Sequence, residues 1–246
     1  MSDLRGKRVI ISGASSGIGL ETARMLVHGG AEVGLVARMA EPLAAVAEEL
    51  GDAAWVRAGD VADPDSVRGL AEEAANRWGA VDGLVNNAGV APMATLDATE
   101  TEVWDETFAV NVRGPFLLCR ELREMLHQGV GSAVVNVSST LAVKAIPGMA
   151  AYNSSKAALN QLTRSLALEW APEVRVNAVM PAVVDTAIHA LRGMTSEQVQ
   201  EMGGLHPLGR VGRPADVAAM IVFLLSDAAS WMTGTIIPVD GGMLAG

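Results

Sequence analysis

Tyr152 and Lys156 are four residues apart in the stretch Ala-Ala-Tyr152-Asn-Ser-Ser-Lys156-Ala-Ala, which has the pattern of a helix. Residues at this spacing lie on one helical face, with Cβ atoms about 5–6 Å apart. A phenol has a pKa of about 10 and is a poor acid or base at neutral pH. An ammonium at about 4 Å favours the phenolate by on the order of 4 kcal/mol, or up to about three pKa units. The pair could then exchange a proton with an alcohol or a carbonyl.

The elements that must position this pair alternate between short apolar runs and helical segments. Strands are expected at 9–12, 32–37, 54–58, 83–86, 133–138, 174–179 and 235–239, and helices at 18–28, 42–50, 65–78 and 152–170, among others. Strands separated by helices form a parallel sheet that is covered on both faces. We therefore predict an α/β fold, with a seven-stranded parallel sheet in a single doubly wound domain over residues 1–246.

Composition narrows the class of protein. The chain has 246 residues, half of them hydrophobic, and a formal net charge of −10, which argues against nucleic acid and anionic membranes as partners. The four histidines and the single cysteine, Cys119, form no cluster with metal-ligand spacing, so no metal is expected. We interpret Cys119 as a buried, small hydrophobic residue. With neither a signal peptide nor a membrane-length apolar run, we expect a soluble, cytoplasmic protein.

One long stretch, residues 182–207, has neither a firm strand nor a core helix. It contains three glycines and a short amphipathic piece in which Thr195 and Gln198 have the spacing of a helix capping box. A long irregular segment in a compact domain is often functional. We predict that it forms a lid over a substrate.

A glycine-rich turn follows the first expected strand, with the sequence Ser-Gly13-Ala-Ser-Ser-Gly17-Ile-Gly19. Gly13 permits a tight turn, Gly17 lets the backbone approach a pyrophosphate, and Gly19 lets the next helix pack closely on the strand. The helix N-terminus then offers free N–H groups to the phosphates. The predicted nucleotide-binding residues of this turn are Gly13, Ser15, Ser16, Gly17, Ile18 and Gly19.

The end of the second expected strand bears on the choice of cofactor. An acidic residue there would bind a ribose 2′-hydroxyl, whereas an arginine favours a 2′-phosphate. The sequence has Ala37 and then Arg38, with no carboxylate at the strand end. We predict NADP(H) in preference to NAD(H). The alternative is that Arg38 is an ordinary solvated surface charge.

Five motifs occur in an order and spacing that resemble the short-chain dehydrogenase/reductase family. They are the glycine turn, Asn86-Asn87-Ala88-Gly89, Asn111, Ser138-Ser139 and Tyr152-x-x-x-Lys156. The resemblance extends from Gly6 to Gly242 and implies a Rossmann-fold oxidoreductase with a nicotinamide cofactor.

The resemblance implies a role for each matched residue of the active site. Tyr152 would be the general acid/base, and Lys156 would lower its pKa and bind the nicotinamide ribose. Ser139, thirteen residues before Tyr152, would bind the substrate oxygen. Asn111 would anchor a water that links Lys156 to solvent. Ser138 is expected to be structural.

Further residues are implied to contact the cofactor. Asp60 and Val61 would touch the adenine, and Asn87, Ala88 and Gly89 would line the adenosine ribose. Asn86 is expected to hold neighbouring strands together. After the sixth strand, Pro181, Val184 and Thr186 would meet the nicotinamide carboxamide.

The chain departs from the family at Ala182, where a glycine usually follows the proline. If that position needs a positive φ, alanine costs on the order of 1 kcal/mol. The expected consequence is weaker or slower cofactor binding at most.

The residues expected to face the reacting carbon are mostly apolar. They are Met93, Thr140, Leu141, Ile146, Met149, Ile188 and His189, with Pro92 beside them. The expected substrate is therefore an uncharged, moderately hydrophobic ketone or secondary alcohol. His189 could contact substrate, but an exposed position on the lid is the favoured interpretation.

Two other functions stay open. One is reduction of 3-oxoacyl groups on acyl carrier protein, although that acidic carrier needs basic docking residues which this acidic chain lacks at 127–131 and after Trp170. The other is a catalytically silent nucleotide-binding scaffold, which the complete set of matched active-site residues disfavours. The resemblance also implies a homotetramer, with interfaces at the C-terminal strand and tail and at the helices on either side of Asn111.

Overall fold

The computed structural model describes residues 4–190 and 193–246, so residues 191 and 192 of the predicted lid lie outside the described residues. One sheet contains all seven strands in the order β3-β2-β1-β4-β5-β6-β7, and every pairing is parallel. The strands are β1 (Arg8–Ser12), β2 (Glu32–Ala37), β3 (Ala54–Ala58), β4 (Gly83–Asn86), β5 (Ala133–Val137), β6 (Arg175–Pro181) and β7 (Ile236–Val239). The predicted α/β fold is confirmed, and no strand boundary differs from its prediction by more than two residues.

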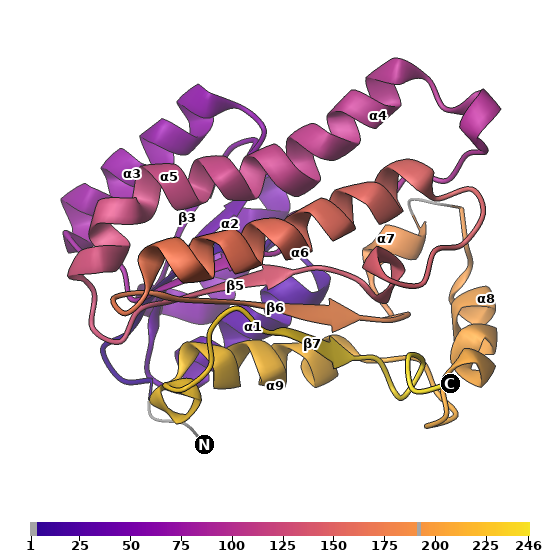
Figure 1. Ribbon diagram of the computed structural model, residues 1–246. Coiled ribbons are helices and arrows are strands. Elements are labelled where there is room, and N and C mark those ends of the chain that lie inside the picture. The colour runs from indigo at the N-terminus through magenta and orange to yellow at the C-terminus, as the bar shows by residue number, and fades with distance from the viewer. Residues whose placement is uncertain (1–3, 191–192) are drawn as a thin grey trace.

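Helices cover both faces of the sheet (Figure 1). The helices are α1 (Gly17–His28), α2 (Ala40–Leu50), α3 (Pro64–Trp78), α4 (Thr101–Phe108), α5 (Gly114–Gln128), α6 (Ala150–Trp170), α7 (Ala187–Ala190), α8 (Ser196–Glu201) and α9 (Pro214–Leu225). Helices α3, α5 and α6 bury their apolar residues against one face. Helices α1, α2 and α9 pack against the other, so the sheet has a core on each side.

Successive residues of the central strands supply the two cores in turn. In β1, Ile10 packs into the core under α3, α5 and α6, whereas Val9 and Ile11 pack into the core under α1 and α9. All three side chains are 1% exposed or less. This is why residues 9–11 of β1 are all apolar instead of alternating with polar residues, as expected for a parallel sheet buried on both faces.

The strand order reverses direction between β1 and β4. Strand β1 pairs with β2 on one side and with β4 on the other. At such a reversal the connections leave toward opposite faces and open a crevice at the carboxyl ends of the strands. The glycine turn follows β1, and the Asn87–Gly89 segment follows β4, so the topology places both at this crevice.

The amino-terminal ends of β1 and β4 are joined by Asp82, which is 3% exposed. Its carboxylate accepts hydrogen bonds from the backbone N and the guanidinium of Arg8 and from the backbone N of Val130. Burial pushes the pKa of Asp82 upward, but these hydrogen bonds outweigh burial and hold the pKa below its ordinary value.

Asp82→Asn is expected to lower the free energy of unfolding at pH 7 by about 2 kcal/mol, because buried hydrogen bonds to a charge are lost. The folded-state pKa lies below the unfolded value of about 3.9, so the contribution is complete above that pH and is lost as the pH falls through the folded pKa. Urea unfolding of both proteins at equal concentration should therefore differ at pH 7 and converge in acid. An unchanged difference at low pH would mean that the carboxylate charge is not responsible.

Candidate active site

Tyr152 and Lys156 lie in the first two turns of α6, as predicted. The helix starts directly after Gly148, whose φ of +76° turns the chain into it. Tyr152 is 9% exposed and Lys156 is 4% exposed, and Nζ of Lys156 lies 5.8 Å from the centroid of the Tyr152 ring. The phenol and the amine therefore share a largely dry environment on one face of the helix.

The Lys156 amine is held at the end of β5. Its Nζ donates to the carbonyl of Val137, at the end of β5, over 2.8 Å. Burial lowers the pKa of Lys156 to about 8, so the amine is mainly protonated at neutral pH. A Cβ placed on Gly89 would lie 3.5 Å from Nζ, so the glycine keeps the end of β4 close to the amine without obstructing it.

Asn111 lies in a π-helical turn, Ala109–Arg113, between α4 and α5. Its Oδ1 accepts from the backbone N of Val90, and its Nδ2 donates to the Val90 carbonyl and to Oγ of Ser155. Ser155 in turn donates to the carbonyl of Tyr152 over 2.8 Å. Asn111 thus joins the start of α6 to the chain after β4. The water contact implied for Asn111 stays a prediction.

Sequence reasoning missed both the π turn and Ser155. A π turn has no sequence signature and is rare, although it often occurs at functional sites. Ser155 could have been noticed because it directly precedes Lys156 and, being three residues from Tyr152, lies on the same side of the helix.

Ser139 follows β5 and is 7% exposed. It caps the short 3₁₀ turn Thr140–Ala142, where its Oγ accepts a hydrogen bond from the backbone N of Leu141 over 3.1 Å. Accepting this bond leaves the hydroxyl proton available to a second oxygen. Ser138 is structural, as predicted, because its Oγ donates to the carbonyl of Lys156 over 3.3 Å.

Three of the predicted substrate residues gather around Tyr152. Met149 belongs to its buried cluster, and Leu141 and Ile188 pack against that cluster. Met93 and Ile146 are farther out and are 66% and 44% exposed. Thr140 is only 1% exposed, and its Oγ1 lies 3.8 Å from Sδ of Met243, a residue that sequence reasoning did not single out.

The favoured interpretation of His189 as an exposed lid residue is wrong. His189 is 7% exposed, and its Nε2 lies 3.0 Å from the carbonyl oxygen of Val184. The short helix α7 folds back toward the end of β6 and brings the ring onto the backbone at Val184. His189 thereby ties the lid to the segment predicted to meet the nicotinamide.

The glycine turn has the geometry of a phosphate cradle. Gly13 and Gly17 have φ values of +65° and +56°, which favour glycine. A Cβ on Gly19 would collide with the carbonyl oxygen of Gly13 and the amide of Asn87. Ser16 caps α1 without a side-chain hydrogen bond, and the first turn has no acidic residue. The N-terminus of α1 is therefore suited to an anion, as a pyrophosphate requires.

Asn87 holds this turn from the neighbouring strand. Its Nδ2 donates to the carbonyls of Ser12 and Gly13, each over 3.0 Å, and Ser12 Oγ accepts from the backbone N of Asn87 and of Ala88. The other predicted cofactor residues lie nearby or at strand ends. Thr186 packs on the turn, since a Cβ on Gly17 would lie 3.1 Å from its Cγ2.

Arg38 follows β2 and forms an ion pair with Glu106 of α4, with 3.9 Å between Nη1 and Oε1. Both side chains are well exposed, at 59% and 60%, so the pair itself contributes little stability. The sequence prediction did not include Glu106, whose position beside Arg38 depends on how α4 packs.

The loop at Ala182 shows no sign of the strain that the missing glycine could have caused. No non-glycine residue in the described part of the chain has a positive φ, and Ala182 is within that part. The condition for weaker cofactor binding is therefore not met. Val184 is 5% exposed and pairs with Gly212, which fixes the loop after Pro181.

Two further predictions about buried polar groups are confirmed. Asn86 Nδ2 donates to Oδ1 of Asn136 over 2.8 Å and so joins β4 to β5. Cys119 is 2% exposed and lies 3.6 Å from the same Nδ2. Burial raises the pKa of Cys119 to about 12, so the thiol is unreactive at neutral pH.

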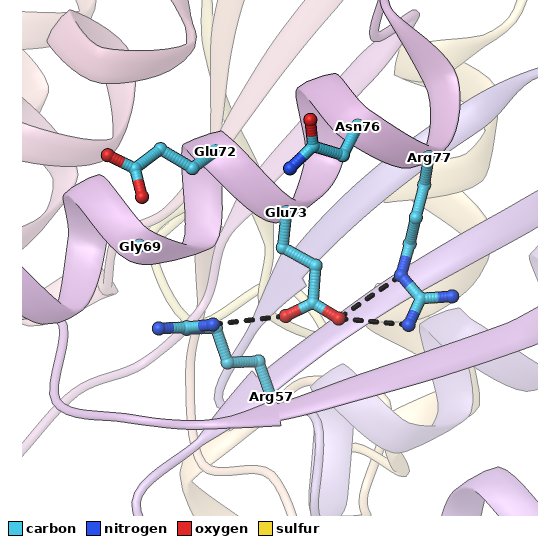
Figure 2. A pocket seen from close by; sticks show the side chains of 6 residues that line it. All are labelled: Arg57, Gly69, Glu72, Glu73, Asn76 and Arg77. Carbon is cyan, nitrogen blue, oxygen red and sulfur yellow. Dashed lines mark hydrogen bonds and ion pairs between the residues drawn. The ribbon is translucent and has the colours of Figure 1, made fainter.

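A surface depression of about 440 Å³ lies over α3 and β3, with no candidate active-site residue in its wall. Figure 2 shows that Glu73 lies between Arg57 and Arg77, and it forms ion pairs with both, at 3.1 and 2.9 Å. The Arg57 guanidinium packs closely on Gly69 of α3. The charges neutralise one another, so the depression is structural.

Comparison with known proteins shows the family to which the chain belongs. A family model described as enoyl-(acyl carrier protein) reductase matches residues 13–244. The cis-4-hydroxycyclohexanecarboxylate dehydrogenase of Sinomonas cyclohexanicum is 41% identical over 252 residues, covering 100% of both chains. A short-chain dehydrogenase/reductase of Brucella melitensis, described as a glucose/ribitol dehydrogenase, superposes with a TM-score of 0.93 at 30% identity, covering 98% of each chain.

A 3-ketoacyl-(acyl-carrier-protein) reductase of Brucella melitensis, solved with NADH, superposes with a TM-score of 0.91 at 35% identity, covering 98% of this chain and 99% of that one. The fold and the site define a Rossmann-type oxidoreductase that uses a nicotinamide cofactor and acts between a carbonyl and an alcohol. The chain belongs to the short-chain dehydrogenase/reductase family. No helix in the described residues is both long and apolar enough to cross a membrane.

Proposed function

We propose that this protein interconverts a ketone and a secondary alcohol, with Tyr152 as the general acid/base. The observation that supports this most directly is the convergence of four groups at the carboxyl ends of β4 and β5. Tyr152 and Lys156 share one face of α6, Lys156 binds the carbonyl that ends β5, and Ser139 follows two residues later. Asn111 joins the same helix to the chain after β4.

These residues have complementary tasks during reduction. When bound, the nicotinamide supplies the hydride that reaches the carbonyl carbon. The Tyr152 hydroxyl donates its proton to the carbonyl oxygen, and the Ser139 hydroxyl donates a hydrogen bond to the same oxygen. Both interactions strengthen as negative charge develops on that oxygen in a dry site. In the oxidation of an alcohol, the Tyr152 phenolate accepts the proton.

The glycine turn supports the cofactor assignment. A Cβ on Gly13 would collide with the backbone of Ala88, so the turn can lie this close to the end of β4 only with glycine there, and the first turn of α1 has no carboxylate to compete with a phosphate. Gly13, Ser15, Ser16, Gly17, Ile18 and Gly19 would hold the pyrophosphate, Asp60 and Val61 the adenine, and Asn87, Ala88 and Gly89 the ribose. Pro181, Val184 and Thr186 would hold the carboxamide.

The apolar side chains around Tyr152 favour a small or medium-sized apolar substrate. Leu141, Met149 and Ile188 pack around Tyr152, and residues 182–207 would close over the substrate as a lid. A relative at 41% identity is named for a hydroxycyclohexane carboxylate, which supports a cyclic secondary alcohol as one candidate.

A substrate panel tests this proposal. Cyclohexanone, 4-oxocyclohexanecarboxylate, an acyclic methyl ketone and the matching alcohols would each be assayed with NADPH and with NADH. We expect turnover of cyclic or apolar ketones, with the uncharged compound preferred over the carboxylate. Absence of turnover with every pair would reject the proposed activity.

We further propose NADP(H) as the preferred cofactor, because Arg38 can bind a 2′-phosphate. Glu106 competes with that phosphate for the guanidinium at 3.9 Å. Arg38→Ala should weaken NADPH binding by about tenfold, and Glu106→Gln should strengthen it by about threefold, with NADH binding nearly unchanged in both. Fluorescence titration with each cofactor measures these constants. Equal changes for NADH and NADPH would show that the 2′-phosphate is not involved.

Reduction of 3-oxoacyl groups on acyl carrier protein is the second candidate, favoured by the name of one superposed structure, a 3-ketoacyl-(acyl-carrier-protein) reductase. The acidic chain argues against docking of an acidic carrier. Carrier-bound and soluble thioester forms of one 3-oxoacyl substrate would be compared. A large preference for the carrier form would establish this candidate.

A silent nucleotide-binding scaffold is disfavoured by the intact set Asn111, Ser139, Tyr152 and Lys156.

We also propose a cytoplasmic homotetramer. Exposed apolar side chains on α5 and α6 suit an interface there, for example Phe116 at 44% and Leu168 at 85%. Light scattering should give four times the 25.5 kDa chain mass, and a monomeric mass would reject the tetramer.

A further inference from the structure

The chain after β7 folds back as an ordered tail, residues 240–246. Asp240 organises it, because its Oδ1 accepts from the backbone N of Gly242 and its Oδ2 accepts from the backbone N of Leu244, each over 2.9 Å. Gly241 and Gly242 have φ values of +60° and +91°, which let the chain reverse. Figure 1 marks the C-terminus beside α8, at the end of the sheet toward which the arrowheads of β6 and β7 point.

One side of this tail packs on the end of the lid. The backbone N of Leu208 donates to the carbonyl of Gly241 over 3.1 Å. A Cβ on Gly241 would lie 3.2 Å from Cβ of His206, and a Cβ on Gly242 would lie 3.0 Å from Cγ of Pro207. The tail is therefore held closely against residues 206–208, at the end of the lid.

The other side of the tail contacts the turn that carries Ser139. The Thr140 hydroxyl lies 3.8 Å from Sδ of Met243, and Lys144 Nζ donates to the Met243 carbonyl over 3.4 Å. Thr140 is 1% exposed, and Met243 is one of the residues in contact with it. The backbone N of Lys144 also donates to the Thr140 carbonyl over 2.9 Å, which closes the turn on itself.

The turn is thus fixed at two points. Inside, the backbone N of Leu141 orients Ser139 Oγ, and Leu141 packs on the Tyr152 cluster. On its outer side, the turn is held by Met243, which contacts Thr140, the residue between Ser139 and Leu141. We propose that Met243 is a positioning residue, which acts through Thr140 to keep the Ser139 hydroxyl and the Leu141 side chain in place for the substrate. This inference rests on the proposed function, because it assigns the substrate end of the same site.

A positioning role makes a selective prediction. Misplacement of a group that binds the reacting oxygen can reduce turnover by on the order of 10²-fold, while the glycine turn and the cofactor contacts stay intact. Met243→Ala should therefore lower kcat/KM for a ketone by about tenfold or more, with the dissociation constant for NADPH unchanged. Met243→Leu keeps the volume of the side chain and should recover most of the loss.

Leu244→Ala is the matched control, since it removes a side chain of similar size from the next residue of the tail. Hydrogen exchange of residues 139–144 gives a second readout that needs no substrate. We expect faster exchange in Met243→Ala and wild-type exchange in both Met243→Leu and Leu244→Ala.

The outcomes separate this inference from the proposed function. Wild-type exchange in Met243→Ala, or equal kinetic losses in Met243→Ala and Leu244→Ala, would overturn the positioning role. Inactivity of the wild-type protein with all ketones would reject the proposed function, while the exchange data would still decide whether Met243 holds the turn.

Discussion

Tyr152→Phe is expected to lower kcat for ketone reduction by about 10³-fold while leaving NADPH affinity unchanged. The substitution removes only the hydroxyl, so the ring still fills its place beside Ala91 and Met149. The lost step is proton donation to the developing alkoxide, for which general acid catalysis contributes about 10²–10⁴-fold. Single-turnover kinetics with NADPH bound in advance would isolate this step from cofactor binding.

Gln161→Ala is a suitable control for Tyr152→Phe, because Gln161 is an exposed residue farther along the same helix. Gln161→Ala should reduce ketones at the wild-type rate. Its midpoint of thermal unfolding should equal that of Tyr152→Phe. Turnover by Tyr152→Phe at the wild-type rate would refute the proposed mechanism. Lost NADPH binding in that variant would instead show that Tyr152 serves mainly to bind the cofactor.

Lys156→Met should produce the second largest effect, a loss of about 10²-fold in alcohol oxidation at pH 7. The Lys156 ammonium, 5.8 Å from the centroid of the Tyr152 ring, favours the phenolate over the neutral phenol. Methionine retains the bulk of the buried side chain but not its charge. The phenol should then ionise only at more alkaline pH.

The pH dependence tests the sign of this effect. Burial lowers the pKa of Lys156 to about 8, so the ammonium is present below that pH and is lost as the pH rises through it. The ratio of wild-type to Lys156→Met rates should therefore be largest below pH 8 and should fall above it. Initial rates of alcohol oxidation from pH 6 to 10 measure this ratio. A ratio that does not vary with pH would mean that Lys156 acts only by binding the cofactor ribose.

Local patterns were sufficient to predict the elements and much of the site. Apolar runs separated by helical segments predicted seven strands, and a parallel sheet buried on both faces explains why those runs are so uniform. Gly13 and Gly17 were identified from a turn between a strand and a helix, where the positive φ values are indeed found. Tyr152 and Lys156 were identified from a spacing that helical geometry places on one face.

The burial of His189 could not be predicted from the sequence. Its place in an irregular, polar segment suggested an exposed side chain, but burial depends on how α7 folds back toward Val184. Ala182 illustrates the same limit. Whether an alanine there is strained depends on its φ, which the loop closed by Val184 and Gly212 determines.

The sequence alone determined the fold class, the family resemblance and the candidate catalytic residues, because each depends on short-range periodicity or on a motif of a few residues. Only the tertiary structure showed that Asn111 binds Ser155, 44 residues away, and that Thr140 contacts Met243, 103 residues away. Such contacts follow from the packing of α4 and the π turn against α6, and of the tail against the turn after β5. No periodicity in the chain encodes them, so they could not be predicted before the sheet and its helices were placed.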